Sequence, residues 1–185
     1  MWSGLSKQKQ KSVHNIPEPP SVSHLNLTRE RSRIRVNDFL RSDEVGHKLG
    51  EIQGWRACFG ARYHGMLYAV CVVGRPTARM LDDDKIVEIT RFATRPERPD
   101  NTGSWLIAKA RDWAYLEGYE EIIAYAGVAG NDGTLYRACG FSLDEKTQAN
   151  GSGWKTHGDG RKEWDDYERR RFSYDLGGIV RRRET

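Results

Sequence analysis

Cysteine is scarce in this chain of 185 residues, and long apolar runs are missing. The three cysteines, Cys58, Cys71 and Cys139, stand singly among apolar neighbours, which is the spacing neither of a disulfide framework nor of a zinc knuckle. No apolar run approaches the length of a membrane span, and the N-terminus carries lysines without an apolar segment behind them. These absences predict a soluble protein of a reducing cytoplasm that does not associate with membranes.

Neither sign of charge dominates, because the chain has 30 Lys and Arg residues and 26 Asp and Glu residues. The basic excess is concentrated in residues 1–35, which hold seven basic and two acidic side chains. Such an excess fits nucleic-acid binding and plain solubility equally well. The length fits one domain with tails.

Composition divides the chain into a flexible basic arm (1–24), one folded domain (25–177) and a basic tail (178–185). The arm has too few apolar residues to bury and contains the proline cluster of residues 17–20. Order is therefore expected to begin near Leu25.

The first half of the domain has mostly a β pattern. A helix is expected to begin around residues 36–40, followed by a glycine-bordered loop at 46–54 that carries His47. Residues 55–61 and 66–73 predict a hairpin, and residues 85–94 predict a further strand.

The period then changes to that of a helix. Apolar residues from Leu106 to Ala114 share one helix face, and Gly118 stands where a C-terminal cap is expected. Residues 119–126 predict a buried strand, which completes a parallel strand–helix–strand crossover. A short helix before Gly140 and strands from Phe141 and at 171–176 follow. The predicted class is α/β (α+β).

The segment from Arg98 to Ser104 joins a strand to the amphipathic helix. Free N–H groups at a helix N-terminus form an anion site, and Gly103 lets a phosphate approach the backbone closely. An ordinary loop-to-helix turn is the alternative.

One strand later comes a segment in which Asn131 opens a short helix, Tyr136 lies four residues before Gly140, and Phe141 begins a strand. Its order and spacing resemble the closing motif of the GNAT (Gcn5-related N-acetyltransferase) family. The resemblance covers about residues 55–176 and implies the GNAT fold, a central mixed sheet flanked by helices. It also implies acetyl-CoA or a related acyl-CoA as cofactor.

The segment from Arg98 is similar to the pyrophosphate loop of that family, with the first glycine replaced by Asn101. Asn tolerates a positive φ but adds a side chain. Gly103→Val is expected to abolish CoA binding and spare the fold. The cofactor-binding residues implied are Phe92, Ala93, Thr94, Arg98, Asn101, Thr102, Gly103, Ser104 and Asn131.

Four further segments, at residues 74–79, 87–94, 133–136 and 170–174, resemble phage-borne Mom-related proteins. The resemblance implies a transferase that elaborates the N6 amine of adenine in DNA, protecting phage or mobile-element DNA from restriction. DNA would then be the partner.

Three residues are catalytic candidates. Glu88, mid-strand among apolar neighbours, would be a general base or would orient the amine, and an ion pair with Arg91 or Arg79 is the alternative. Tyr136 would protonate a departing thiolate, as the GNAT resemblance implies, unless it is a core tyrosine. His47 would touch substrate, act as a base or bind a metal, unless it is solvated surface.

The predicted DNA-binding residues are aromatic or basic, which suits stacking and phosphate contact. They are Arg75, Arg79, Arg91, Trp154, Lys155, Arg161 and Trp164. The two tryptophans would otherwise cover a small core.

Two alternatives stay open beside the DNA-modifying enzyme. One is an ordinary GNAT that acetylates an amine on a small molecule or a protein. The other is a non-catalytic DNA-binding module, suggested by Asn101 in the phosphate loop. A metal requirement and the oligomeric state are left undecided.

Overall fold

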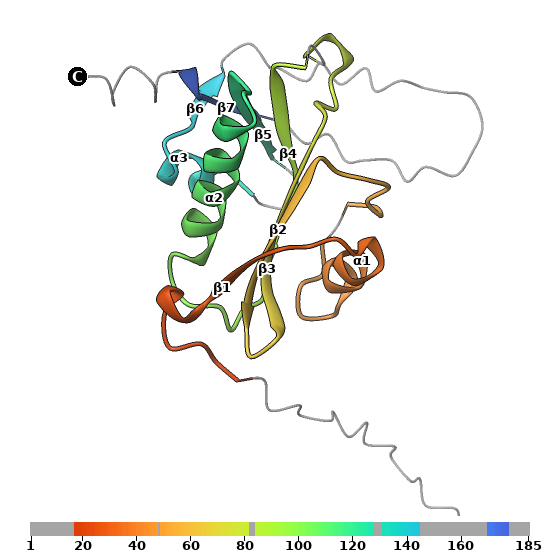
Figure 1. Ribbon diagram of the computed structural model, residues 1–185, viewed down its shortest axis with the longest axis vertical. Helices are drawn as coiled ribbons and strands as arrows, with labels where there is room; N and C mark the ends of the chain where they lie inside the picture. Colours follow the sequence, from red (N-terminus) through yellow and green to blue (C-terminus); the bar gives the residue numbers. More distant parts are fainter. Residues whose placement is uncertain (1–16, 48, 82–83, 128–130, 145–169, 178–185) are drawn as a thin grey trace, which may run out of the picture.

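A seven-stranded mixed sheet forms the centre of the molecule, with strand order β1-β2-β3-β4-β5-β7-β6 (Figure 1). The computed structural model describes residues 17–47, 49–81, 84–127, 131–144 and 170–177. The strands are β1 (Asn26–Arg29), β2 (Ala57–Tyr63), β3 (Met66–Gly74), β4 (Ile86–Thr94), β5 (Glu121–Ala126), β6 (Ser142–Asp144) and β7 (Arg170–Asp175). Strands β4 and β5 pair in parallel, and the other neighbouring pairs are antiparallel.

Helices cover both faces of the sheet. On one face lie α2 (Thr102–Leu116) and α3 (Thr134–Ala138), and on the other lies α1 (Arg33–Arg41) (Figure 1). Single 3-10 turns, η1 (Val22–His24) and η2 (Arg79–Leu81), complete the elements. The predicted class, a central mixed sheet flanked by helices, is confirmed.

The central strands β2 and β3 are buried on both sides because each face of the sheet is covered by a helix. Leu106, Ile107 and Ala110 of α2 pack with Phe59 and Cys71 in the larger core. Val36, Phe39 and Leu40 of α1 pack with Val70 and Val72 in the smaller core. Burying these alternating sets of side chains gives the sheet its register.

The predicted parallel crossover is confirmed, since α2 connects β4 to β5. Strand β1 is missing from the prediction, because its short NLTR sequence is mostly exposed and has no apolar alternation. Residues 17–24, expected within the arm, include η1 and the Pro17 carbonyl, which accepts a hydrogen bond from the Tyr68 hydroxyl. No helix in the described part of the chain is long and apolar enough to cross a membrane.

Two irregularities of β4 position the site. The register with β3 shifts between Val72 and Val73, so that Val72 pairs with Arg91 and Val73 with Ile89, and Thr90 is the extra residue of a bulge. On its other side, β4 pairs with β5 only from Ile86 to Ile89. The carboxyl half of β4 therefore separates from β5.

Candidate active site at the carboxyl half of strand β4

The opening between β4 and β5 exposes backbone groups of β4. Residues 90–94 continue the strand and have no strand partner on the β5 side within the described chain. Extended backbone there can pair with a bound ligand, as an added strand would. Phe92, Ala93 and Thr94 lie at this opening, and their contact with a cofactor stays a prediction.

The loop at residues 95–101 leads from β4 into the N-terminus of α2. Asn101 caps this helix in the left-handed conformation, with φ of 63° and no hydrogen bond from its side chain to the helix end. The Thr102 hydroxyl donates to the Pro99 carbonyl at 2.7 Å, and the Ser104 hydroxyl donates to the Asn101 carbonyl at 3.1 Å. Asn101 therefore has the backbone conformation that a glycine would have at this position. It differs from a glycine only by its side chain.

The N-terminus of α2 keeps free hydrogen-bond donors. Within the described chain, the backbone N–H groups of Gly103 and Ser104 have no acceptor, which is the usual state of the first turn of a helix. Their partial positive charge favours an anion. Arg98 is exposed in the loop before the helix, and its guanidinium donates to the Arg95 carbonyl at 3.1 Å.

Gly103 also lies in a tight contact between helices. A Cβ atom on Gly103 would lie 2.9 Å from Leu135 Cδ1 of α3 and 3.5 Å from Phe92 Cζ. A valine must therefore displace the Leu135 side chain. Gly103→Val, expected to spare the fold, cannot separate loss of binding from altered packing.

Tyr136 of α3 is almost completely buried, at 4% exposure. Its ring packs against Phe141 and Phe172, with centroids 5.7 and 5.8 Å away. Burial raises the pKa of Tyr136, and the nearby Cys71, Glu88 and Cys139 raise it further. The hydroxyl thus stays protonated at neutral pH and is close enough to Glu88 to be affected by its charge. Tyr136 is therefore a residue of the hydrophobic core.

Glu88 is the buried carboxylate of β4, at 5% exposure. Thr77 holds it with two hydrogen bonds, from its backbone N–H to Oε2 at 2.6 Å and from its hydroxyl to Oε1 at 2.9 Å. Two hydrogen bonds from one residue fix the orientation of this carboxylate. Thr77 was not among the predicted residues, since a threonine eleven residues away carries no local signal.

His47 is half-buried beside α1. Its backbone N–H donates to the Leu40 carbonyl at 2.9 Å, and its Nδ1 accepts from Leu49 N at 3.3 Å. Burial and the charge of Arg91 lower the pKa of His47. Its imidazole is therefore neutral at pH 7 and is held by its own loop, and its contact with a substrate stays a prediction.

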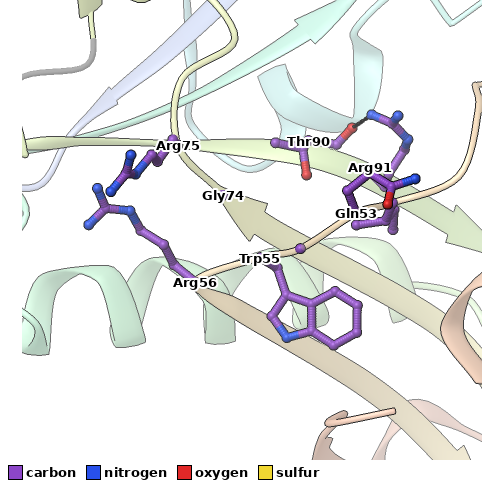
Figure 2. A pocket seen from close by; sticks show the side chains of 9 residues that line it. Gln53, Trp55, Arg56, Gly74, Arg75, Thr90 and Arg91 are labelled. Carbon is purple, nitrogen blue, oxygen red and sulfur yellow. Dashed lines mark hydrogen bonds between the residues drawn. The ribbon is translucent and has the colours of Figure 1, made fainter. Parts of the chain in front are cut away.

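The pocket beside β4 is lined largely by arginine and glycine. It has a volume of about 410 Å³, and its lining residues are Ile52, Gln53, Gly54, Trp55, Arg56, Gly74, Arg75, Thr90 and Arg91 (Figure 2). The structure thus brings together Arg75 and Arg91, two of the predicted phosphate contacts. Trp55 and Arg56 were missed, because the expected strand began at Trp55 and its residues were assigned to the hairpin.

The other predicted residues lie elsewhere. Arg79 is exposed on η2 and does not line this pocket. Asn131 is exposed before α3, where its Oδ1 accepts from Gly133 N at 3.1 Å. Trp154, Lys155, Arg161 and Trp164 lie outside the described residues, as do the tail at 178–185 and most of the arm. Among the described His, Cys, Asp and Glu residues, no group of three or more is arranged to hold a metal ion.

The fold is that of known acetyltransferases. The chain is similar to a Bacillus subtilis acetyltransferase solved in complex with CoA, with a TM-score of 0.53 and 18% identity over 82% of this chain and 98% of that one. It is similar to yncA from Salmonella typhimurium, solved with its cofactor acetyl-CoA, with a TM-score of 0.55 and 12% identity over 83% and 94% of the two chains. An IAA acetyltransferase from Bacillus cereus gives a TM-score of 0.51 and 14% identity over 82% and 99%. No protein-family model and no curated protein matches the chain.

These structures confirm the predicted GNAT fold. The comparisons provide no support for the resemblance to Mom-related proteins.

Proposed function

We propose that this chain is an acyl-CoA-dependent N-acyltransferase that acetylates an amine on a small molecule or a protein. The observation that carries the proposal is the opening between β4 and β5, which ends at the free N–H groups of Gly103 and Ser104 on α2. Fold neighbours solved with CoA and with acetyl-CoA support the choice of cofactor.

The donors at this opening fit a CoA molecule. Gly103 and Ser104 would bind the pyrophosphate through their N–H groups, and exposed Arg98 would add a positive charge. The backbone of Phe92, Ala93 and Thr94 would pair with the amide groups of the pantetheine arm. When bound, an acyl-CoA supplies a thioester whose carbonyl carbon is open to an amine.

Two side chains of this chain would handle protons. Glu88, oriented by Thr77, would accept a proton at a carboxylate oxygen from the incoming amine, directly or through a water molecule. Tyr136 keeps its proton at Oη and would give that proton to the departing thiolate, the role that the GNAT resemblance implies.

The test is a titration of the purified protein with CoA by calorimetry, followed by assays of thiol release from acetyl-CoA with a panel of amines. Saturable CoA binding and amine-dependent thiol release are expected. Arg98→Gln should weaken CoA binding, whereas Lys109→Gln, a charge-matched change at a half-buried position within α2, should not. A parent protein that does not bind CoA would overturn the proposal.

The second candidate is the same chemistry with adenine of DNA as the acceptor. The observation that favours it is the arginine-lined pocket beside β4, together with the sequence resemblance to Mom-related proteins. Nucleosides from a plasmid kept in cells with the protein would contain a deoxyadenosine derivative of higher mass. Unmodified nucleosides beside active acetylation of free amines would exclude it.

A further inference from the structure

The pocket of Figure 2 lies on the same stretch of β4 that carries the candidate base. Thr90 and Arg91 of β4 line it, and so does Gly74, which pairs with Glu88 across the sheet. Thr77, which holds the Glu88 carboxylate, follows Gly74 by only three residues. An acceptor in this pocket would therefore lie beside Glu88, on β4 next to the cofactor opening.

The charge of the pocket is strongly positive. Arg56, Arg75 and Arg91 contribute three guanidinium groups, and none of the described residues that line the pocket is acidic. Arg56 and Arg75 extend their guanidinium groups to the same end of the pocket (Figure 2). Cations gathered in this way repel each other and attract an anion.

Two of the arginines are held in place. Arg56 donates to the Tyr119 hydroxyl at 2.8 Å and to Asp84 at 3.0 Å, and the Asp84 side chain is 86% exposed, so that water screens its charge. Arg91 donates to the Thr90 carbonyl at 2.7 Å and to the Gly50 carbonyl at 3.3 Å. Fixed guanidinium groups bind carboxylate or phosphate with less loss of side-chain freedom than mobile ones.

The remaining wall includes Trp55. This residue is half-buried and lines the pocket, and its indole is directed away from the guanidinium groups of Arg56 and Arg75 (Figure 2). A volume of about 410 Å³ has room for a small molecule or one nucleotide unit.

We propose that this pocket binds the acceptor amine through an anionic group, a carboxylate or a phosphate, held by Arg56 and Arg75 at their shared end of the pocket, with Arg91 adding positive charge at the other end. This inference rests on the proposed function and adds the substrate class. An acceptor with a carboxylate would be a small amino acid. An acceptor with a phosphate would be a nucleotide, either free or within a DNA strand.

The experiment uses two pairs of acceptors, each with one member that carries the anion and one that lacks it. L-phenylalanine is compared with L-phenylalaninamide, and dAMP with deoxyadenosine, by kcat/KM for acetyl transfer from acetyl-CoA. In parallel, N-acetyl-L-phenylalanine and dAMP are titrated by calorimetry without acetyl-CoA. The variants are Arg75→Gln and Arg75→Lys, at an exposed position, with Arg31→Gln as an exposed charge-matched control outside the pocket.

In one of the two pairs, the member with the anion should have a kcat/KM at least about tenfold higher than the member without it. If this is the phenylalanine pair, the anion is a carboxylate, and if it is the dAMP pair, the anion is a phosphate. Arg75→Gln should remove that preference and the calorimetric binding, Arg75→Lys should keep part of both, and Arg31→Gln should keep all. Equal values within both pairs, or a preference that survives Arg75→Gln, would overturn the inference.

Failure of the proposed function is distinguishable. A protein that does not bind acetyl-CoA fails as an acyltransferase, while the calorimetric titrations still test the pocket. If neither anion binds, or if Arg75→Gln binds as the parent does, the anion site is refuted on its own.

Discussion

At the scale of single residues, the structure gives Glu88 and Tyr136 different environments. Glu88 is oriented by two donors of Thr77, whereas Tyr136 lies among aromatic rings and thiols that disfavour its ionised form. Thr77 therefore fixes the direction of the Glu88 carboxylate, and burial keeps the Tyr136 hydroxyl protonated.

Tyr136→Phe should lower kcat roughly a hundredfold, because the acid is lost while the ring remains. The melting temperature should change little, since the packing on Phe141 and Phe172 is kept. Tyr174→Phe, a half-buried control whose ring packs on Phe141 at 5.5 Å, should leave kcat unchanged. Equal rates for Tyr136→Phe and the parent would make Tyr136 a core residue only.

Glu88→Gln should also lower kcat roughly a hundredfold, because an amide cannot accept the proton. Thr77→Val removes one of the two orienting hydrogen bonds and should cost less, about a fewfold. Steady-state rates and melting curves are measured together. A Glu88→Gln variant that melts earlier yet turns over normally would assign Glu88 to structure instead of chemistry.

His47 predicts a pH dependence of stability. Its folded pKa lies below the ordinary value of 6.5, so below that pH the unfolded chain binds more protons than the folded one. Its contribution to the unfolding free energy is therefore present above pH 6.5 and is lost as the pH falls towards the folded pKa.

Urea unfolding at about pH 8 and about pH 5.5 measures this effect. His47→Asn, whose Oδ1 can accept from Leu49 N in place of Nδ1, should reduce the loss of stability at the lower pH. His64→Asn, in the exposed β2–β3 turn, is the control and should keep the loss. An unchanged pH dependence in His47→Asn would contradict the interpretation.

At the scale of elements, the N-terminus of α2 depends on Asn101 in a left-handed conformation. Its φ of 63° is close to that of a glycine in this conformation, and its side chain makes no capping hydrogen bond. Asn101 in place of the first glycine of the GNAT loop therefore adds a side chain at the helix end. The backbone keeps the conformation that a glycine would have there.

Asn101→Ala should destabilise the protein by about 1 kcal/mol, because a positive φ costs alanine more conformational energy than asparagine. Asn101→Gly should not destabilise it, and CoA binding should be equal or tighter without the side chain. Denaturant unfolding and calorimetry check the two expectations. Equal losses for Ala and Gly would show that the asparagine side chain, and not its φ, supports this helix.

At the scale of the whole molecule, the charge distribution separates the two candidate acceptors. Residues 1–16 hold three lysines and no acid. A truncation should start after Ile16, because the Pro17 carbonyl accepts a hydrogen bond from Tyr68.

If DNA is the acceptor, its affinity should fall steeply with salt, because each neutralised phosphate releases counterion. Removing residues 1–16 should then reduce the salt slope by at most about one per lysine lost, while Arg75→Gln should weaken binding at every salt concentration. Fluorescence anisotropy with a labelled duplex measures both. Salt-independent or undetectable binding would leave the small-molecule or protein amine as the acceptor.

The sequence by itself determined the features that depend on neighbours along the chain. The period of residues 106–114, the cap at Gly118 and the spacing of Asn131, Tyr136 and Phe141 were sufficient for the crossover, the short helix and the GNAT fold. Local hydrogen bonding and burial of one face dictate such elements, so their signal is present in short windows.

Only the tertiary structure decided how the site is assembled. Glu88 is oriented by Thr77, and the pocket joins Arg56, Arg75 and Arg91 from three separate segments. The bulge at Thr90 and the separation of β4 from β5 arise from pairing between distant strands. A register of that kind is set by the packing of both sheet faces at once, and no local pattern of residues encodes it.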